Sequence, residues 1–192
     1  MHSKYNSVRI ISGKYKSRKV SFPSRSELRP TGNRIRESLF NWIHLEISSS
    51  RCLDLFAGSG ALGIEALSRG ATTATFIESD REAAFYLENN LRNLDATNGN
   101  VIVSDAIDWL KCSKDINPFN IVFLDPPFKG NLLVECVHLL DSNYMISDHG
   151  SIYVESETEF DQRILPKSWR LKHRNQAGRV YYYLYKKINK KG

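Results

Sequence analysis

A chain of 192 residues, with 41% hydrophobic and 25% charged side chains, is long enough to bury one core and fits a single globular domain. No apolar run approaches the roughly 18 residues that a membrane-spanning helix needs, and the first ten residues lack the apolar stretch of a signal peptide. Because Cys52, Cys112 and Cys136 lie far apart and no histidine cluster accompanies them, we expect reduced thiols in a cytoplasmic protein, without a disulfide or a metal site.

Charge is distributed unevenly along the chain, whose net charge is +6. Residues 1–36 contain ten lysines and arginines against one acid, and residues 167–192 contain nine against none. The 130 residues between these two ends carry eight basic and twenty acidic side chains. Two basic ends on an acidic body are typical of a protein that binds a polyanion, provided that the ends meet on one face. The alternative is a pair of solvated tails.

The N-terminal part predicts a short hairpin followed by a helix. Residues 9–11 and 19–22 fit two strands around the turn-prone residues 12–16. From Asn33 onward, apolar residues recur four positions apart, which indicates one buried helical face, and Thr31 is its expected N-cap. The residues of this apolar face are Ile35, Leu39, Ile43 and Ile47.

Strands and helices then alternate along the chain. The expected strands span residues 52–56, 73–78, 100–104, 120–125 and 151–155, and the expected helices span 61–68, 81–94, 106–111 and 132–140. The strands are almost continuously apolar, which is typical of parallel strands that are covered on both faces. This order predicts an α/β fold with a parallel sheet and right-handed crossovers. Residues 169–173 and 179–187 predict an antiparallel hairpin at the end.

The first candidate site is the glycine-rich run Asp54-Leu55-Phe56-Ala57-Gly58-Ser59-Gly60, which leads from a strand into a helix. Glycines let a ligand approach the backbone closely, and the free N–H groups of a helix start attract an anionic group. Together with Gly63 the run also fits the G-x-G-x-x-G pattern, so a nicotinamide-dependent dehydrogenase is an alternative. Asp54 favours a methyltransferase, because a carboxylate there repels a pyrophosphate and suits the ammonium group of methionine.

Acidic residues also end the next two expected strands. Glu78 stands where a carboxylate can hold ribose hydroxyls, and Asp105 is followed by Ala106. Asp105 can accept a hydrogen bond from an adenine amino group with Ala106 against the ring, although an N-cap is the simpler interpretation of this aspartate. Because ligands of open α/β sheets gather at the carboxyl ends of the strands, Asp54, Glu78 and Asp105 together predict a site for S-adenosylmethionine.

The sharpest motif is Asp125-Pro126-Pro127-Phe128 at the end of the fourth strand. An exocyclic amino group of guanine or adenine is a poor nucleophile, because its lone pair is delocalised into the ring. Two acceptors that draw its N–H bonds out of the ring plane direct the lone pair at a methyl donor. The Asp125 carboxylate and the Pro126 carbonyl can be these acceptors, and the prolines fix the backbone that aims them. Phe128 offers a face on which the target base can stack.

The order of these motifs resembles that of the class I amino-methyltransferases, and further segments resemble the bacterial RsmD family. These segments are Arg29-Pro30-Thr31, the run from Arg34 to Trp42, Ile152-Tyr153-Val154-Glu155 and Ala177-Gly178-Arg179-Val180. Members of that family use S-adenosylmethionine to methylate N2 of a guanine, 966 in conventional numbering, in the 16S rRNA of the small ribosomal subunit. The resemblance extends from Arg9 to about Lys187.

This resemblance implies a Rossmann-like fold with a seven-stranded, mostly parallel sheet and an antiparallel C-terminal hairpin. It divides the chain into a basic hairpin extension (1–28) that contacts RNA, a methyltransferase domain (29–187) and a frayed tail (188–192). The implied catalytic residues are Asp125, Pro126, Pro127 and Phe128. The implied ligands of S-adenosyl-L-methionine are Asp54, Phe56, Ala57, Gly58, Gly60, Glu78, Asp105, Ala106 and Thr31.

The implied partner is 16S rRNA in the small ribosomal subunit. Its expected contacts are Lys14, Lys16, Arg18, Lys19, Arg29 and Arg34, with the hairpin beside the mouth of the active site. Two alternatives remain open, an adenine-N6 methyltransferase acting on DNA or RNA and a non-catalytic RNA-binding assembly factor. The short chain leaves little room for the target-recognition segment of a DNA enzyme, and the intact motifs at Asp54, Asp105 and Asp125 argue against loss of catalysis.

Overall fold

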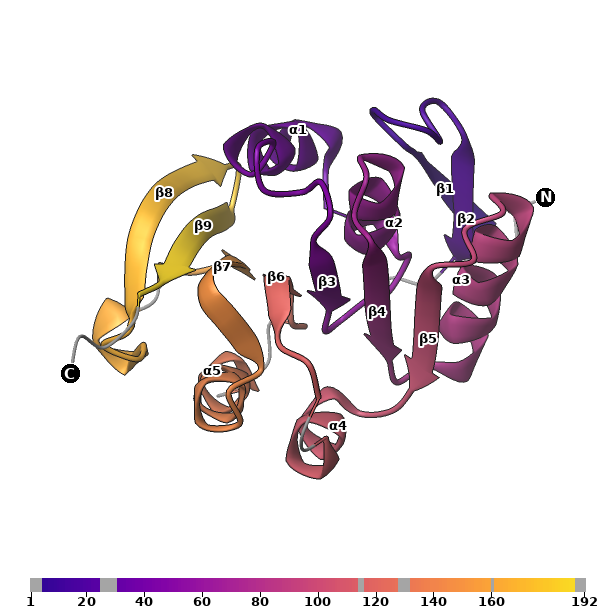
Figure 1. The fold of residues 1–192 in the computed structure, drawn as a ribbon. Helices are drawn as coiled ribbons and strands as arrows, with labels where there is room; N and C mark the ends of the chain where they lie inside the picture. The colour runs from indigo at the N-terminus through magenta and orange to yellow at the C-terminus, as the bar shows by residue number, and fades with distance from the viewer. Residues whose placement is uncertain (1–4, 25–30, 114–115, 128–131, 160, 189–192) are drawn as a thin grey trace.

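The computed structural model describes residues 5–24, 31–113, 116–127, 132–159 and 161–188, and it contains one large sheet with helices on both faces (Figure 1). The strands of this sheet are β3 (Arg51–Asp54), β4 (Thr73–Glu78), β5 (Gly99–Val103), β6 (Phe119–Leu124), β7 (Ile146–Ser156), β8 (Trp169–Ala177) and β9 (Val180–Lys187). Their order is β5-β4-β3-β6-β7-β9-β8. The predicted seven-stranded α/β sheet is therefore confirmed.

The first five strands of the sheet are parallel. β3 pairs with β4 on one side and with β6 on the other, while β5 and β7 extend the sheet outward in the same direction. β9 runs antiparallel between β7 and β8, as the C-terminal hairpin predicts. The chain thus builds the sheet to one side of β3 and then returns to build the other side. Such a reversal opens a crevice at the carboxyl ends of the central strands, where α/β proteins bind ligands.

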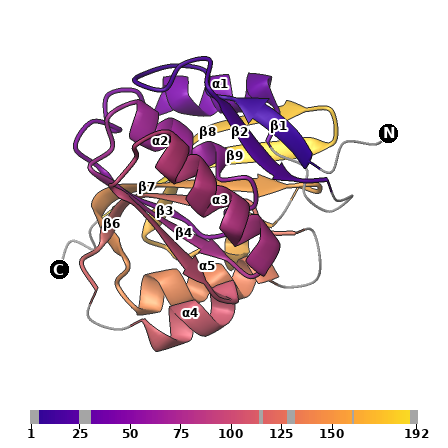
Figure 2. The same ribbon diagram turned by 90° about the vertical axis from the view of Figure 1, so that its right-hand side faces the viewer.

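Two helical layers cover the sheet (Figure 2). On one face lie α1 (Asn33–Trp42), α2 (Ala61–Ser68) and α3 (Arg81–Asn93), and on the other lie α4 (Ala106–Cys112) and α5 (Leu132–Ser142). The side chains of β6 show why the sequences of the strands are almost continuously apolar. Ile121 and Phe123 belong to one buried cluster and Val122 and Leu124 to the other, because successive side chains of a strand point to opposite faces.

The N-terminal hairpin of β1 (Tyr5–Arg9) and β2 (Lys19–Pro23) packs onto the same face as α2 and α3. Its first strand begins earlier than the sequence predicts. Val8, Ile10, Tyr15, Val20 and Phe22 are all buried and belong to the main hydrophobic cluster. The hairpin is therefore part of the core of the protein as well as a carrier of basic residues.

A buried ion pair connects this hairpin to two helices. Glu65 in α2 and Arg36 in α1 are both fully buried, and Arg36 Nη1 lies 3.4 Å from Glu65 Oε2. The backbone amides of Ile11 and Ser12 donate to the two Glu65 oxygens at 2.7 and 3.0 Å. Arg36 Nη2 donates to the Arg9 carbonyl at 2.9 Å. Burial of Arg36 lowers the pKa of its guanidinium, so the Glu65 carboxylate is needed to balance that charge.

Two local predictions about the first helix are wrong. The N-cap of α1 is Gly32, and no side chain caps the helix, because the Thr31 hydroxyl is directed to two carboxylates instead. The helix also ends at Trp42, although the expected apolar face continues. Ile43 and Ile47 remain buried in the turns that follow, so the predicted apolar residues reach the core although the last two are not helical.

Candidate active site at the carboxyl edge of the sheet

Five parallel strands each end at an acidic side chain along one edge of the sheet. These residues are Asp54 at the end of β3, Glu78 at the end of β4, Asp105 after β5, Asp125 after β6 and Glu155 near the end of β7. The sequence predicts the first four, and the strand order brings them side by side. Glu155 carries no predicted role in the sequence beyond its place in a segment of family resemblance. Its position at the end of a buried strand, like that of Asp54 and Glu78, is the signal that identifies it.

The glycine turn after β3 is held by the acids beside it. Gly63 N–H donates to Asp54 Oδ2 at 3.0 Å, and Gly58 N–H donates to Glu78 Oε2 at 2.6 Å. Gly58 and Gly60 both adopt positive φ angles, 51° and 74°, and Gly60 is the N-cap of α2. The turn therefore needs glycine for its backbone conformation, and the acids fix the turn against the strand ends.

A side chain at Gly60 would meet the protein itself, in addition to any ligand that approaches the glycine turn. A Cβ atom there would overlap the buried side chain of Leu87 in α3. We expect Gly60→Ala to destabilise the fold through both the left-handed backbone, about 1–2 kcal/mol, and overpacking against Leu87, about 1–3 kcal/mol. Gly178, at φ 61° with open space within 4 Å of where a Cβ atom would lie, is the matched control for backbone strain alone. Urea unfolding curves that show equal losses for Gly60→Ala and Gly178→Ala would contradict the packing argument.

Glu78 and Asp105 are both engaged with backbone amides. Glu78 Oε1 accepts from Asp80 N–H at 2.8 Å, and burial raises the pKa of this carboxyl. Asp105 is the N-cap of α4, and its Oδ1 accepts from Ile107 and Asp108 at 2.8 and 3.1 Å. The N-cap interpretation of Asp105 is thus confirmed. Both cap hydrogen bonds use Oδ1, which leaves Oδ2 of this exposed residue outside the cap.

Asp125 is joined to Glu155 through Thr31. The Thr31 hydroxyl oxygen lies 3.1 Å from Asp125 Oδ2 and 2.8 Å from Glu155 Oε1. The Tyr153 hydroxyl also lies 2.8 Å from Glu155 Oε1. Thr31 is 8% exposed and Glu155 is 3% exposed, so the Glu155 side of this group is nearly closed to water, whereas Asp125 is half-buried. Thr31, in the segment that leads into α1, thereby contacts the carboxyl ends of β6 and β7.

Besides Glu78, burial raises the pKa of three further carboxyls at this edge. The pKa of Asp54 rises to about 7, although the hydrogen bond from Gly63 opposes the rise. The pKa of Asp125 rises to about 6, opposed by the hydrogen bond from Thr31. The pKa of Glu155 rises to about 8, because burial and the neighbouring Asp125 charge act in the same direction. Perturbed carboxyls concentrated at one edge are typical of a functional site.

The loop after Asp125 is described only in part. Pro126 is buried and Pro127 is exposed, so the start of the predicted catalytic loop follows directly on β6. Phe128, the expected stacking residue, and Arg29, an expected RNA contact, both lie outside the described residues. Within the parts of the chain that are described, no group of His, Cys, Asp or Glu is arranged to hold a metal ion.

The hairpin cations do not lie beside this edge, in contrast to our expectation. Lys14 N–H donates to the carbonyl of Ser68, the last residue of α2, and Arg18 Nη2 donates to the carbonyl of Asn93, the last residue of α3. Both helices start at the carboxyl edge, so the hairpin tip lies at the opposite end of the sheet (Figure 1). Lys16 and Lys19 belong to the same exposed tip and its adjoining strand. Among the predicted RNA contacts that the structure describes, Arg34, exposed in the first turn of α1, is the one that follows Thr31 most closely in the chain.

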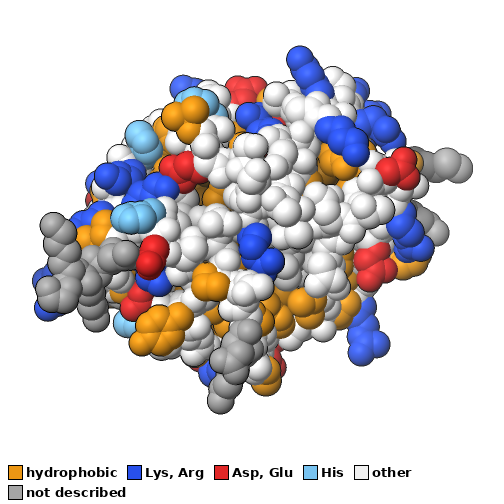
Figure 3. Space-filling view, in the orientation of Figure 1, with side chains coloured by type: hydrophobic (Ala, Val, Ile, Leu, Met, Phe, Trp, Pro, Cys, Tyr) orange, Lys and Arg blue, Asp and Glu red, His pale blue; other side chains and the backbone are white. Residues whose placement is uncertain are grey.

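In the part of the chain that the structure describes, the basic N-terminal hairpin also does not pack against the basic C-terminal strands. β2 packs against α3, which covers β4 and β5, whereas β8 and β9 form the other border of the sheet. Figure 3 shows lysine and arginine side chains spread around the rim of one face rather than gathered in a single patch. Among the C-terminal tyrosines, Tyr182, Tyr183 and Tyr185 are buried, so they contribute to the core and are not available for stacking with RNA.

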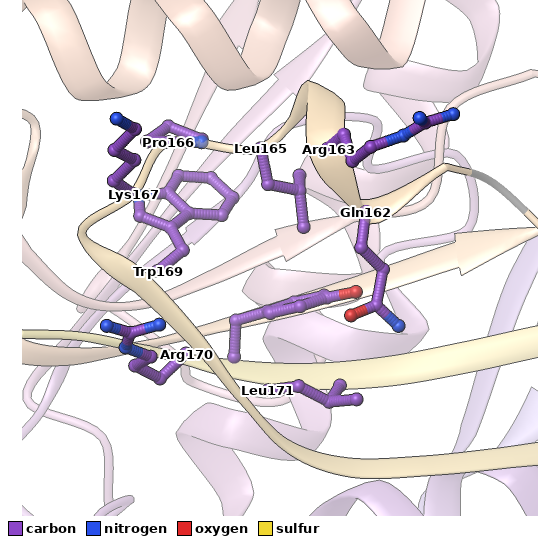
Figure 4. A pocket seen from close by; sticks show the side chains of 9 residues that line it. Gln162, Arg163, Leu165, Pro166, Lys167, Trp169, Arg170 and Leu171 are labelled. Atoms are coloured by element: carbon purple, nitrogen blue, oxygen red, sulfur yellow. The ribbon is translucent and has the colours of Figure 1, made fainter.

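A separate cavity of about 640 Å³ lies at the C-terminal border of the sheet (Figure 4). Its lining combines the 3-10 helix η1 (Gln162–Ile164) with the start of β8. Arg163, Lys167 and Arg170 contribute positive charge, and Trp169 and Tyr185 contribute ring surface. None of the five edge acids lines this cavity, so it is distinct from the candidate active site.

Comparison with known proteins decides the family. The family model "Conserved hypothetical protein 95" matches residues 8–186. The ribosomal RNA small subunit methyltransferase D of Escherichia coli strain K12 is 46% identical over 97% of this chain and 93% of its own length. The protein of the same name from Haemophilus influenzae is 43% identical over 93% of both chains. The chain belongs to the RsmD family.

Solved structures agree with the RsmD assignment. The Escherichia coli protein yhhF superposes with a TM-score of 0.85 at 46% identity, over 95% of this chain and 99% of its own. The precorrin-6y C5,15-methyltransferase of Geobacter metallireducens superposes with a TM-score of 0.66 at 17% identity, which shows a shared methyltransferase fold. The RsmD chain described here therefore has the predicted class I methyltransferase architecture. No described helix is long and apolar enough to cross a membrane.

Proposed function

We propose that this chain transfers a methyl group from S-adenosylmethionine to the N2 amino group of a guanine in 16S rRNA, the guanine called 966 in conventional numbering. The observation that carries the proposal is the position of Asp125-Pro126-Pro127 directly beside the glycine turn, at one edge of the sheet. The names of the Escherichia coli and Haemophilus influenzae relatives support methylation of small-subunit rRNA. The substrate would be a small ribosomal particle in the cytoplasm.

The residues at the edge fit the methyl donor. S-adenosylmethionine, when bound, supplies an electrophilic methyl group on a sulfonium, and it carries a second positive charge on its ammonium group. Asp54 would face the ammonium group, Glu78 the ribose hydroxyls and Asp105 Oδ2 the adenine amino group. Each Glu78 oxygen accepts one backbone hydrogen bond and keeps a second lone pair for a hydroxyl. The remaining lining residues would be Phe56, Ala57, Gly58, Gly60 and Ala106.

The target amino group would be oriented by the catalytic loop. The Asp125 carboxylate and the Pro126 carbonyl would accept hydrogen bonds from the two N–H groups of the target amino group. These hydrogen bonds turn the nitrogen lone pair toward the methyl group. Because the pKa of Asp125 is raised only to about 6, the carboxyl is ionised near neutral pH and is a strong acceptor. Phe128 would stack on the base after it leaves its own stack.

The proposed RNA contacts divide into two groups. Arg34 lies three positions after Thr31 and would contact phosphates beside the target guanine, as would Arg29, which precedes Thr31 in the chain. Lys14, Lys16, Arg18 and Lys19 belong to the hairpin tip beside the last residues of α2 and α3, and α2 alone, a helix of 8 residues, spans roughly 12 Å. These four cations would therefore bind a part of the rRNA backbone separate from the target loop.

The main competing function is an adenine-N6 methyltransferase, because the same amino-group geometry serves adenine. The decisive experiment supplies radiolabelled donor to small ribosomal subunits from a strain that lacks the enzyme, and then analyses the nucleosides by mass spectrometry. N2-methylguanosine at a single 16S rRNA position supports the proposal. N6-methyladenosine would replace it with the competing function, and tight subunit binding without label transfer would indicate an assembly factor.

Donor affinity should depend on pH through Asp54. The pKa of its carboxyl is raised to about 7 by burial, and an adjacent ammonium group favours the ionised form. The affinity should therefore fall as pH decreases below 7, by up to about tenfold per pH unit. Calorimetry between pH 5.5 and 7.5 measures this slope. Asp54→Asn can still accept the Gly63 hydrogen bond and should bind weakly with no slope, whereas a flat wild-type profile would remove Asp54 from the donor site.

A further inference from the structure

The hydrogen bonds around the Thr31 hydroxyl need one more hydrogen than these side chains supply when both neighbouring carboxyls are ionised. The Thr31 hydroxyl has one hydrogen, yet it lies within hydrogen-bond distance of a carboxylate oxygen of both Asp125 and Glu155. If both carboxyls were ionised, one of these contacts would have no hydrogen, and two negative charges would face each other across a single hydroxyl. Glu155 and Tyr153 are 3% and 0% exposed, so water is not at hand to compensate.

One added proton satisfies every contact. With the proton on Glu155 Oε1, the Tyr153 hydroxyl donates to Glu155, Glu155 donates to Thr31, and Thr31 donates to Asp125 Oδ2. Each hydroxyl then donates once, and the chain of donors ends on a single ionised carboxylate. The reverse arrangement, with the proton on Asp125, satisfies the same contacts but places the negative charge on Glu155, the more deeply buried of the two carboxyls.

We propose that Glu155 is a positioning residue that stays protonated and, through Thr31, keeps Asp125 ionised and aimed at the target amino group. The proposal rests on the proposed function of Asp125 and assigns a role to a residue that does not itself touch the substrate. It also gives Thr31 a different task from donor binding. Through its hydrogen bonds, the Thr31 hydroxyl makes the orientation of the Asp125 carboxylate, which follows β6, depend on the protonation of Glu155 in β7.

The charges around Glu155 support this distribution of the proton. Asp125 and Asp54 are the charged groups that act on Glu155 most strongly, and both disfavour its ionisation. Tyr153 lies on the same strand as Glu155, and Tyr182 of β9 is the cross-strand partner of Glu155, with its hydroxyl directed to Ser38. Burial is the largest cause that raises the pKa of Glu155, to about 8, and the neighbouring charges add to it against the hydrogen bonds from Thr31 and Tyr153. Glu155 is 3% exposed whereas Asp125 is only half-buried, so the negative charge is better tolerated on Asp125 and the shared proton belongs on Glu155.

The consequence is a bell-shaped pH profile of single-turnover methylation. The rate should rise through pH 6 as Asp125 ionises and fall above pH 8 as Glu155 ionises and competes for the hydrogen of Thr31. Glu155→Gln retains a neutral donor, so it should keep the acidic limb, lose the decline near pH 8 and stay within about threefold of the wild-type rate at pH 7. Glu155→Ala and Thr31→Val break the donor chain and should lower the rate about tenfold or more, with Thr31→Ser restoring it.

A measurement without substrate separates this proposal from the proposed function. Carbon NMR of the protein with labelled glutamate carboxyls should show one group that titrates near pH 8 and is missing in Glu155→Gln. Absence of that titration, or a decline near pH 8 that persists in Glu155→Gln, would overturn the role of Glu155. A wild-type protein with the expected titration that methylates no guanine would instead overturn the proposed function and leave the proton on Glu155 in place.

Discussion

Replacing Asp125 with alanine should lower kcat by about 100-fold or more while donor affinity stays within a few-fold of wild type. The carboxylate would act when the amino nitrogen leaves the plane of the base, so its contribution belongs to the transition state and not to donor binding. Rapid-quench measurement of label transfer to small ribosomal subunits gives the rate, and calorimetry gives the donor affinity. Asp125→Asn is a milder change, because its amide oxygen can still accept one hydrogen bond.

The matched control for this prediction is Asp148→Ala. Asp148 is an exposed aspartate near the start of β7, whereas Asp125 follows the end of β6, so removing it changes the net charge equally but far from the reacting edge. We expect Asp148→Ala to methylate at close to the wild-type rate. If Asp125→Ala turned over as fast as Asp148→Ala on small subunits, the orientation of the amino group by Asp125 would be wrong, and the proposed mechanism would have to be abandoned.

Much of the sheet and of its acidic edge could be predicted from the sequence, because both depend on patterns that are local in the chain. A run such as Ile121-Val122-Phe123-Leu124 is apolar because helices cover both faces of its strand, and all four side chains are indeed fully buried. A parallel sheet places every strand end at the same edge, so acids that end successive strands must come together. The acidic edge could therefore be predicted from the parallel direction of the strands, without their exact order in the sheet.

Contacts between distant segments could not be predicted in the same way. Nothing in the local sequence of Thr31 shows that its hydroxyl reaches Glu155, which lies 124 positions further along the chain. The lysines of the N-terminal hairpin suggest RNA binding, and on that ground its tip is expected at the active site. The structure places it at the other end of α2, where Ser68 accepts from Lys14 N–H and its hydroxyl accepts from Tyr15 N–H. Backbone hydrogen bonds, rather than charge, determine that position.

The position of the hairpin changes what its removal should do. Deletion of residues 1–27 would expose the surface now covered by five buried apolar side chains, each contributing roughly 1.5–3 kcal/mol. The loss is comparable with the whole free energy of unfolding of an ordinary domain, about 5–15 kcal/mol. We therefore expect the truncated protein to lack a cooperative unfolding transition and to bind no donor, rather than to fold and ignore its RNA substrate. Circular dichroism with urea titration and donor calorimetry test both expectations.

A charge-only variant distinguishes the two roles of this segment. Lys14→Gln, Lys16→Gln and Lys19→Gln combined remove exposed cations and keep the backbone, so the free energy of unfolding should stay within about 1 kcal/mol of wild type. In the deletion, by contrast, Glu65 loses the Ile11 and Ser12 amides, and Arg36 loses the Arg9 carbonyl. A buried pair with missing partners is costly, so the truncation carries an electrostatic penalty as well as lost apolar burial. A truncated protein that still unfolds cooperatively and binds donor would show instead that the hairpin is an appendage, despite its buried contacts with α1, α2 and α3.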